Sequence, residues 1–209
     1  MLTQLSCRDF AVELASKKPV PGGGGAAALV AALGTALNTM VANFSYKKKK
    51  FIDVKEKHED LIKRGEILRE KLVDLVDKDA DYFEPLSKAY VMPSNTEEEK
   101  KHKEEVMQKC LIVACTAPME TLIYSYDAIL LHKEIEDISS KNIISDVGVG
   151  VQCLKAALNS AYLNVLINLN SISDQNYVTT NIEKAEKLVL EGNKLADEIY
   201  EKVINIINE

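Results

Sequence analysis

One uncharged stretch of 28 residues, residues 19–46, constrains the fold of this chain more than any other feature. It contains four consecutive glycines, Gly22, Gly23, Gly24 and Gly25, which follow Pro21 and precede a run of Ala, Leu and Val. Ordering tandem glycines is entropically costly, so they indicate either positive φ angles or the close approach of another group to the backbone. The residues after them predict a helix buried on all sides, over residues 26–44, which a glycine-rich loop enters.

Apolar side chains recur at three- and four-residue steps through most of the remaining chain, as they do in amphipathic helices. No segment alternates with period two for long enough to predict a strand. The spacing of a capping box predicts three helix starts: Ser6 with Asp9, Thr96 with Glu99, and Thr180 with Glu183. The sequence therefore predicts a single domain over residues 1–209, folded as an all-α, up-and-down bundle of about six helices.

A second predicted helix, residues 147–169, shares the small and nearly uncharged character of the first. Lys155 is its one charged residue, Ser145 is its expected N-cap, and Asp146 falls in its first turn, where a carboxylate is favoured. The simplest packing pairs the two helices at the centre of the bundle. The loops before Ala26 and Ser145 then become candidate walls of a site, and the sequence leaves open whether they meet in one subunit or across two.

Composition limits the partners that such a bundle would have. The net charge of −6 lacks the basic balance of a nucleic-acid-binding protein, so no nucleic-acid partner is predicted. The uncharged helix is near the ~20 residues that span a bilayer. However, Thr35, Asn38, Thr39 and Asn43 interrupt it, which favours burial in a bundle over a membrane. The N-terminus lacks a basic region followed by an apolar core, so no signal peptide is expected.

Cysteine and histidine spacing argues against a metal site. The four cysteines form no CxxC pair and are predicted to be buried free thiols in a reducing cytoplasm: Cys7, Cys110, Cys115 and Cys153. The three histidines lie among charged residues without ligand spacing and are predicted to be surface residues: His58, His102 and His132.

Three features could carry chemistry, and each has an ordinary structural alternative. The four glycines match no P-loop, but they could present N–H groups to a carboxylate or phosphate at a helix start, or simply form a tight turn. The lysine run 47–50 is either a solvated helix end or an anion-binding patch. Asp146 is either a common first-turn carboxylate or a functional group.

Several motifs resemble the formiminotetrahydrofolate cyclodeaminase family, which also includes methenyltetrahydrofolate cyclohydrolases. The resemblance rests on PVPGGG at residues 19–24 with the Ala- and Leu-rich helix behind it, and on residues 45–51. Further matches are DADYF at residues 79–83, Ala117-Pro118, Lys141-Asn142, Ser145-Asp146, and residues 156–169. The chain departs from the family pattern at Gly25, where Ser is usual, at Ser139-Ser140, where Gly-Asn is frequent, and at Lys47, where Gly is common.

The resemblance implies an all-α fold, a homodimer, and a folate site in a groove near or across the subunit interface. It implies a cyclodeaminase that converts 5-formiminotetrahydrofolate to 5,10-methenyltetrahydrofolate and ammonia. Methenyltetrahydrofolate cyclohydrolase is the alternative activity, and a non-catalytic folate-binding or scaffold protein is a further one, because a fold does not guarantee a function. No metal and no cofactor beyond the tetrahydrofolate substrate are expected.

The resemblance also assigns roles to individual residues. Asp146 becomes the carboxylate nearest the chemistry, as a proton shuttle or as an anchor of the pterin ring. Lys141 would orient the substrate or donate a proton, and Asp79 would hold a lysine in place. The resemblance assigns the remaining residues to substrate binding. The glycines would let folate lie against backbone N–H groups, and the lysines would attract the acidic tail of a tetrahydrofolate, polyglutamated forms included. The set is Pro21, Gly22, Gly23, Gly24, Gly25, Lys47, Lys48, Lys49, Asn142 and Ser145.

Overall fold

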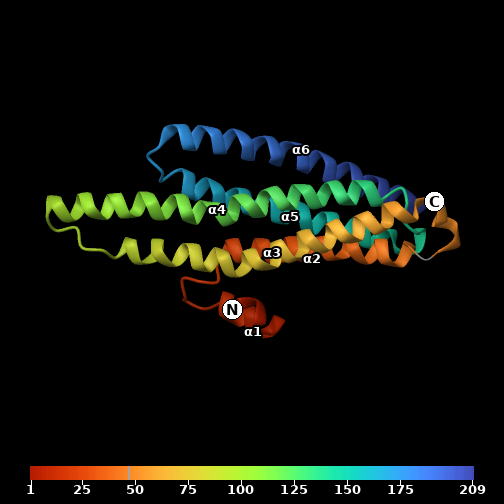
Figure 1. Ribbon diagram of the computed structural model, residues 1–209, viewed down its shortest axis with the longest axis horizontal. Coiled ribbons are helices and arrows are strands. Elements are labelled where there is room, and N and C mark those ends of the chain that lie inside the picture. The colour runs from red at the N-terminus through yellow and green to blue at the C-terminus, as the bar shows by residue number, and fades with distance from the viewer. Residues whose placement is uncertain (47) are drawn as a thin grey trace.

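The computed structural model describes residues 1–46 and 48–209, and those residues form helices and their connections without a strand. Lys47, one of the lysines expected to attract the folate tail, lies outside them. The α-helices are α1 (Cys7–Leu14), α2 (Gly23–Tyr46), α3 (Lys55–Tyr90), α4 (Glu97–Ile135), α5 (Ile144–Leu169) and α6 (Gln175–Asn208). Short 3-10 turns are η1 (Leu2–Gln4), η2 (Lys49–Val54) and η3 (Lys141–Ile143). The predicted all-α, up-and-down bundle is confirmed (Figure 1).

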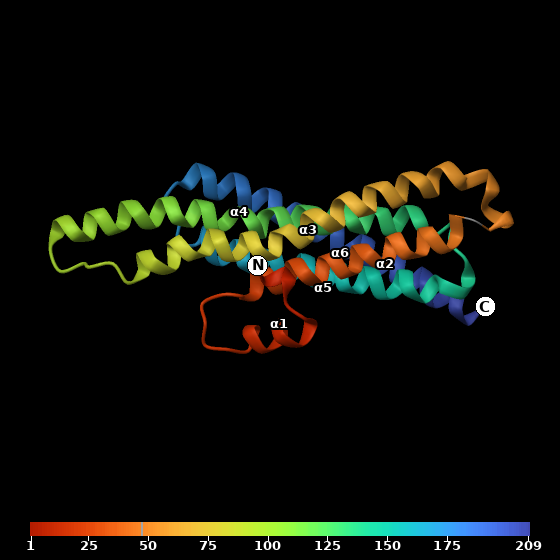
Figure 2. The same ribbon diagram turned by 60° about the horizontal axis from the view of Figure 1, so that its bottom comes forward.

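Helices α2 and α5 form the antiparallel pair at the centre of this bundle. Helix α2 packs against α3, α4 and α5, whereas α5 packs against α2, α4 and α6. Their backbones come close where Gly34 faces Gly150: a Cβ on Gly34 would lie 2.9 Å from the Gly150 carbonyl oxygen. The short helix α1 lies apart from the long helices, beside the first half of α2 (Figure 2). The predicted pairing of the two small-residue helices is therefore confirmed.

Two of the predicted capping boxes start helices as expected. Ser6 Oγ accepts the Asp9 N–H at 3.1 Å at the start of α1. Thr96 Oγ1 accepts the Glu99 N–H at 3.2 Å, and Glu99 Oε2 accepts the Thr96 N–H at 3.1 Å. These local hydrogen bonds satisfy N–H groups that a helix start leaves without a partner.

Two other predicted starts are wrong. Helix α6 begins at Gln175, because Asp174 already caps it by accepting the N–H groups of Asn176 and Tyr177 at 3.0 and 3.1 Å. The Thr180 pattern thus falls inside the helix. Helix α5 begins at Ile144 directly after the turn η3, so Ser145 lies within its first turn instead of capping it.

The buried histidines and one exposed cysteine correct further predictions. His58 and His132 are fully buried, because neighbouring helices cover positions that look polar in the sequence. His58 Nδ1 and Nε2 lie 3.1 and 3.0 Å from the carbonyl oxygens of Val54 and Ile138. Cysteines at all four positions are free, but Cys7 is exposed, whereas Cys115 is buried as predicted.

Two helices, α2 and α4, are long and apolar enough to cross a membrane by length and composition alone. In α2, 61% of the apolar window is buried by other helices, and in α4 the share is 44%. Packing within the bundle therefore already accounts for most of the apolar character of α2.

The buried ring of His132 predicts a loss of stability in mild acid. Burial lowers the pKa of His132 to about 4, against roughly 6.5 in an unfolded chain, so the fold favours the neutral ring. This contribution is fully present above pH ~6.5 and is lost as the pH falls towards ~4, by up to about 3 kcal/mol. We expect His132→Leu to flatten the dependence of the urea-unfolding free energy on pH in this window. His102→Leu, at an exposed position, is the control and should leave it unchanged; an equal slope in wild type and His132→Leu would contradict the prediction.

Candidate functional site

The first turn of α2 is built from glycines, and α3 lies closely against it. Helix α2 begins at Gly23, so Gly23, Gly24 and Gly25 belong to the helix. The sequence had suggested instead that they form a loop before it. No described glycine has a positive φ. A Cβ on Gly24 would lie 2.2 Å from Asp79 Oδ1, and the Gly25 N–H donates to Asp79 Oδ2 at 2.9 Å. Gly24 therefore allows the close approach of a carboxylate to the helix.

Asp79 on α3 is held against this helix start as an acceptor. Burial raises the pKa of its carboxyl group, and the hydrogen bond from Gly25 opposes that shift. The described part of the chain places no lysine within ion-pair distance of Asp79, so the expected lysine partner is not found within one subunit. The positive end of the α2 dipole and the Gly25 N–H compensate the carboxylate instead.

A cavity of about 300 Å³ opens beside this contact, and we call it the glycine-end cavity. Gly22, Gly23, Gly24 and Asp79 all line it, so the structure brings four predicted residues together. Gly25 is not among the lining residues but donates its N–H to Asp79, and Pro21 is buried directly before Gly22. Helices α3, α4 and α5 complete its wall: Phe83, Leu86, Tyr90, Ala114, Pro118, Asn164, Ile167 and Asn168.

Two asparagines of this wall were not predicted. Asn164 Nδ2 donates to the Ser160 carbonyl, and Asn168 Nδ2 donates to the Asn164 carbonyl, both at 2.8 Å. Because a carbonyl oxygen can only accept, these bonds orient each side-chain amide with its nitrogen towards the helix backbone. The amide oxygen then remains as an acceptor for other groups. The available signal was the four-residue spacing, which places two amides on one face of a nearly uncharged helix.

The other predicted residues lie at the opposite end of the α2–α5 pair. Lys48 and Lys49 follow the end of α2, Lys141 and Asn142 form η3, and Ser145 and Asp146 open α5. All but the half-buried Asp146 are exposed, and Lys141 Nζ lies 3.2 Å from Glu209 Oε2. These six residues share one end of the bundle, but none of them lines the glycine-end cavity.

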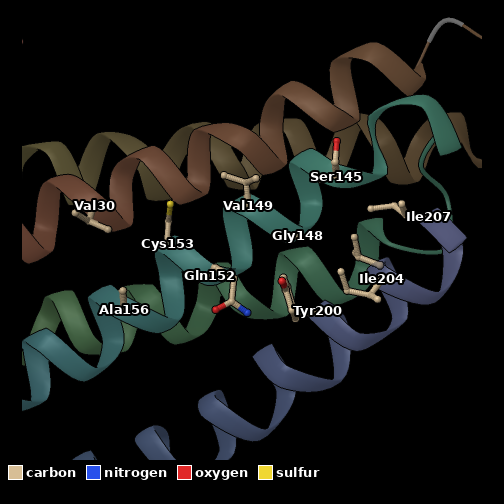
Figure 3. A pocket seen from close by; sticks show the side chains of 11 residues that line it. Val30, Ser145, Gly148, Val149, Gln152, Cys153, Ala156, Tyr200, Ile204 and Ile207 are labelled. Atoms are coloured by element: carbon tan, nitrogen blue, oxygen red, sulfur yellow. The ribbon is translucent and has the colours of Figure 1, made fainter.

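A larger cavity of about 600 Å³ lies between α5 and α6 near that second end (Figure 3). Ser145 is the predicted site residue among those that line it, and most of the others are apolar, such as Val149, Tyr200 and Ile204. Few polar groups converge there, and a ligand site needs such groups to fix orientation. We therefore take the glycine-end cavity as the candidate site.

The two ends are too far apart to form one pocket within a subunit. Gly23 lies beside Asn164, because a Cβ on Gly23 would be 3.7 Å from that amide. Asp146 is 18 residues earlier than Asn164 on the same helix, which corresponds to about 27 Å along α5. Within one subunit, the loops before α2 and α5 do not meet.

Comparison with known proteins gives one consistent family. Residues 6–187 match the family model described as formiminotransferase-cyclodeaminase. A methenyltetrahydrofolate cyclohydrolase of Methylorubrum extorquens is 35% identical over 93% of this chain and 94% of its own length. The formimidoyltransferase-cyclodeaminase of Mus musculus is 31% identical over 91% of this chain, which spans only 35% of that protein. The crystal structure of a formiminotetrahydrofolate cyclodeaminase from Thermotoga maritima matches with a TM-score of 0.81 at 31% identity, covering 100% of this chain and 98% of that one.

The contact between Gly24 and Asp79 predicts a sharp difference between neighbouring glycines. Gly24→Ala should destabilise the fold by about 1–3 kcal/mol, because its Cβ would overlap the carboxylate. Gly23→Ala should be close to neutral, because its Cβ meets Asn164 at an ordinary 3.7 Å. Urea unfolding of both variants, repeated in an Asp79→Ala background, checks this. The penalty of Gly24→Ala should disappear in that background, and its persistence would contradict the prediction.

Proposed function

Because the chain belongs to the formiminotransferase-cyclodeaminase family, we propose that it acts on the one-carbon unit of a tetrahydrofolate derivative. The first candidate activity is that of a formiminotetrahydrofolate cyclodeaminase, in which N10 attacks the formimidoyl carbon on N5 and ammonia leaves. The match over the whole chain to a solved protein of that name carries this proposal. Methenyltetrahydrofolate cyclohydrolase is the second candidate, favoured by a relative of similar length at 35% identity.

Both reactions need the same two contributions from the protein. An amine leaves poorly until it is protonated, so a proton must be moved, and the N5–N10 unit must be held in reacting geometry. Asp146 is the proposed proton shuttle. Lys141 is exposed and pairs with Glu209 at the chain end, so it can exchange that partner for substrate. The exposed Lys48 and Lys49 at the same end would attract the acidic glutamate tail, polyglutamated forms included.

A homodimer is supported by the outward face of the two central helices. On α2, apolar residues alternate at four- and three-residue steps, and on α5 the same steps carry small and apolar residues. Leu33 and Phe44 on α2 are 57% and 59% exposed, and Leu163 on α5 is 66% exposed. An exposed seam with this spacing is the pattern with which helices pack against other helices. We call it the α2–α5 face: Ala26, Val30, Leu33, Leu37, Met40 and Phe44, with Val149, Cys153, Ala156, Ser160, Leu163 and Ile167.

A second copy of the chain on the α2–α5 face would also bring together the two groups of site residues that lie at opposite ends of one subunit. A two-fold axis across the antiparallel pair places the same patch of both subunits in contact with itself. The glycine end of one subunit then faces the Asp146 end of its partner. The proposal is therefore a folate site shared between two subunits, with no cofactor beyond the tetrahydrofolate. A cytoplasmic location is part of the proposal, supported by the four free cysteines.

The two candidate activities are separated by assays on one preparation. Ammonia release from 5-formiminotetrahydrofolate reports the cyclodeaminase, and loss of methenyl absorbance reports the cyclohydrolase. We expect turnover of at least one substrate, and Asp146→Asn should remove nearly all of it, because the amide cannot shuttle a proton. Binding of folate without turnover of either substrate would replace the proposal with a non-catalytic folate-binding protein. Near-normal kcat with a raised KM in Asp146→Asn would leave that residue an anchoring role only.

A shared site predicts recovery of activity when two inactive variants are combined. We expect Asp79→Asn to remove turnover as Asp146→Asn does, because it neutralises the carboxylate at the glycine end of the shared site. Subunits of the two variants, co-expressed with different tags, should form mixed dimers in which one of the two sites is intact. With random pairing, the mixture should regain about one quarter of wild-type turnover. Leu163→Asp in both subunits should abolish dimers and recovery, as measured by light scattering and assay. Leu190→Asp, at a 75% exposed position of α6 outside the face, should leave both unchanged. Dimers without recovery would show that the two aspartates do not act at a shared site.

A further inference from the structure

His58 joins two segments at the end of the bundle where α5 begins. Its Nδ1 lies 3.1 Å from the carbonyl oxygen of Val54, the last residue of η2, and its Nε2 lies 3.0 Å from the carbonyl oxygen of Ile138. The turn η2 contains Lys49, and Ile138 lies three residues before Lys141, the first residue of η3. One side chain of α3 therefore contacts both segments that carry predicted site lysines.

The two contacts call for a proton on each ring nitrogen. A backbone carbonyl oxygen can only accept, whereas a neutral imidazole has one N–H and one bare nitrogen. A neutral His58 ring would therefore direct a nitrogen lone pair at one of the two carbonyl oxygens, at a hydrogen-bond distance. The imidazolium form donates to both, and the distances of 3.0 and 3.1 Å suit two N–H···O bonds.

The surroundings of the ring offset the cost of burying a positive charge. His58 is fully buried, and a buried charge needs hydrogen bonds or a partner. Ile138 lies in the turn that ends α4, where its own N–H donates to the Ile135 carbonyl at 3.1 Å, and the end of a helix favours a cation. The buried ring of Phe51 packs at 5.8 Å from the imidazole, centroid to centroid, and helps to exclude water from the two bonds.

His132 shows a different arrangement around an equally buried histidine. Its Nδ1 lies 3.0 Å from the Ala128 carbonyl oxygen, and its Nε2 has no hydrogen-bond partner among the described residues. One N–H is enough for that single acceptor, and burial lowers the pKa of this ring to about 4, so the ring is neutral at neutral pH. The two buried histidines thus differ in the number of carbonyl oxygens that face the ring.

We propose that His58 is a positioning residue of the shared folate site, which as an imidazolium fixes η2 and the connection between α4 and η3 relative to each other. This inference rests on the proposed function and deepens it, because it names what holds the residues around Asp146 in place. The ring is buried, so it acts through the two segments and not on the substrate itself.

The nitrogen-15 spectrum of the imidazole rings tests the protonation state directly. The chain has three histidines, so His102→Leu and His132→Leu assign the signals. At neutral pH we expect both ring nitrogens of His58 to have the shifts of protonated nitrogens, whereas His132 should show one protonated and one bare nitrogen. A bare nitrogen in His58 would overturn the inference. This measurement uses the wild-type chain, so it decides the point even if a His58 variant does not fold.

Hydrogen exchange of the full chain tests the positioning. His58→Leu should speed amide exchange about tenfold or more in residues 48–54 and in residues 136–143, because both segments lose a bond to a charged donor. Residues 22–30, at the other end of α2, should exchange as in wild type. His132→Leu is the matched control, because it also removes a buried imidazole, and it should leave residues 48–54 unchanged. Equal exchange in wild type and His58→Leu would contradict the positioning role.

Turnover separates this inference from the proposed function, because neither measurement above needs a substrate. In an active chain, His58→Leu should lower kcat about tenfold to a hundredfold, since small displacements of catalytic groups are costly, and His132→Leu should keep it close to wild type. Wild-type kcat in His58→Leu retains the enzyme and overturns the positioning role. A doubly protonated His58 that restrains both segments, in a chain that turns over neither folate substrate, supports the bridge and removes the enzymatic proposal.

Discussion

The close crossing of α2 and α5 is the contact on which the arrangement of this bundle depends. At Gly34 and Gly150 each backbone approaches the other so closely that a Cβ on Gly150 would lie 3.2 Å from the Gly34 carbonyl oxygen and 2.3 Å from the His132 ring. Small side chains at the crossing let two nearly uncharged helices lie together, and α3, α4 and α6 pack around them. Any larger residue would push the pair apart and move every element that uses it as a support.

The antiparallel direction of that pair determines how the functional residues are distributed. Residues near the start of α2 share an end with the last turns of α5, whereas residues near the start of α5 share an end with the last turns of α2. The glycines with Asp79 and the residues around Asp146 are consequently kept apart, although the sequence motifs suggest one site. The exposed α2–α5 face runs between these two ends, so one packing event with a second copy would both cover apolar surface and unite the two groups.

The sequence predicted what depends on local spacing and missed what depends on neighbours. Helix class and the caps at Ser6 and Thr96 follow from residues three or four apart, and both were confirmed. His58 and His132 look polar in their own helices, yet other helices bury them, which no local pattern reveals. At the candidate site, the glycines and Asp79 were predicted separately, but their contact spans 54 positions in sequence. Asn164 and Asn168 were missed because an Asn on a helix is usually a surface residue.

Features that disfavour folding are concentrated in the glycine-end cavity. Tandem glycines begin a helix, a proline interrupts another helix, and a carboxylate is held where burial raises its pKa. Each of these lowers stability by itself, and a proline inside a helix costs about 3 kcal/mol. All of them adjoin the same cavity of about 300 Å³, where Pro118 lacks the N–H that would have bonded the Ala114 carbonyl and the Asp79 carboxylate bonds the Gly25 N–H at the start of α2. A ligand that hydrogen-bonds to these groups would stabilise this end of the bundle, because buried polar groups gain partners on binding.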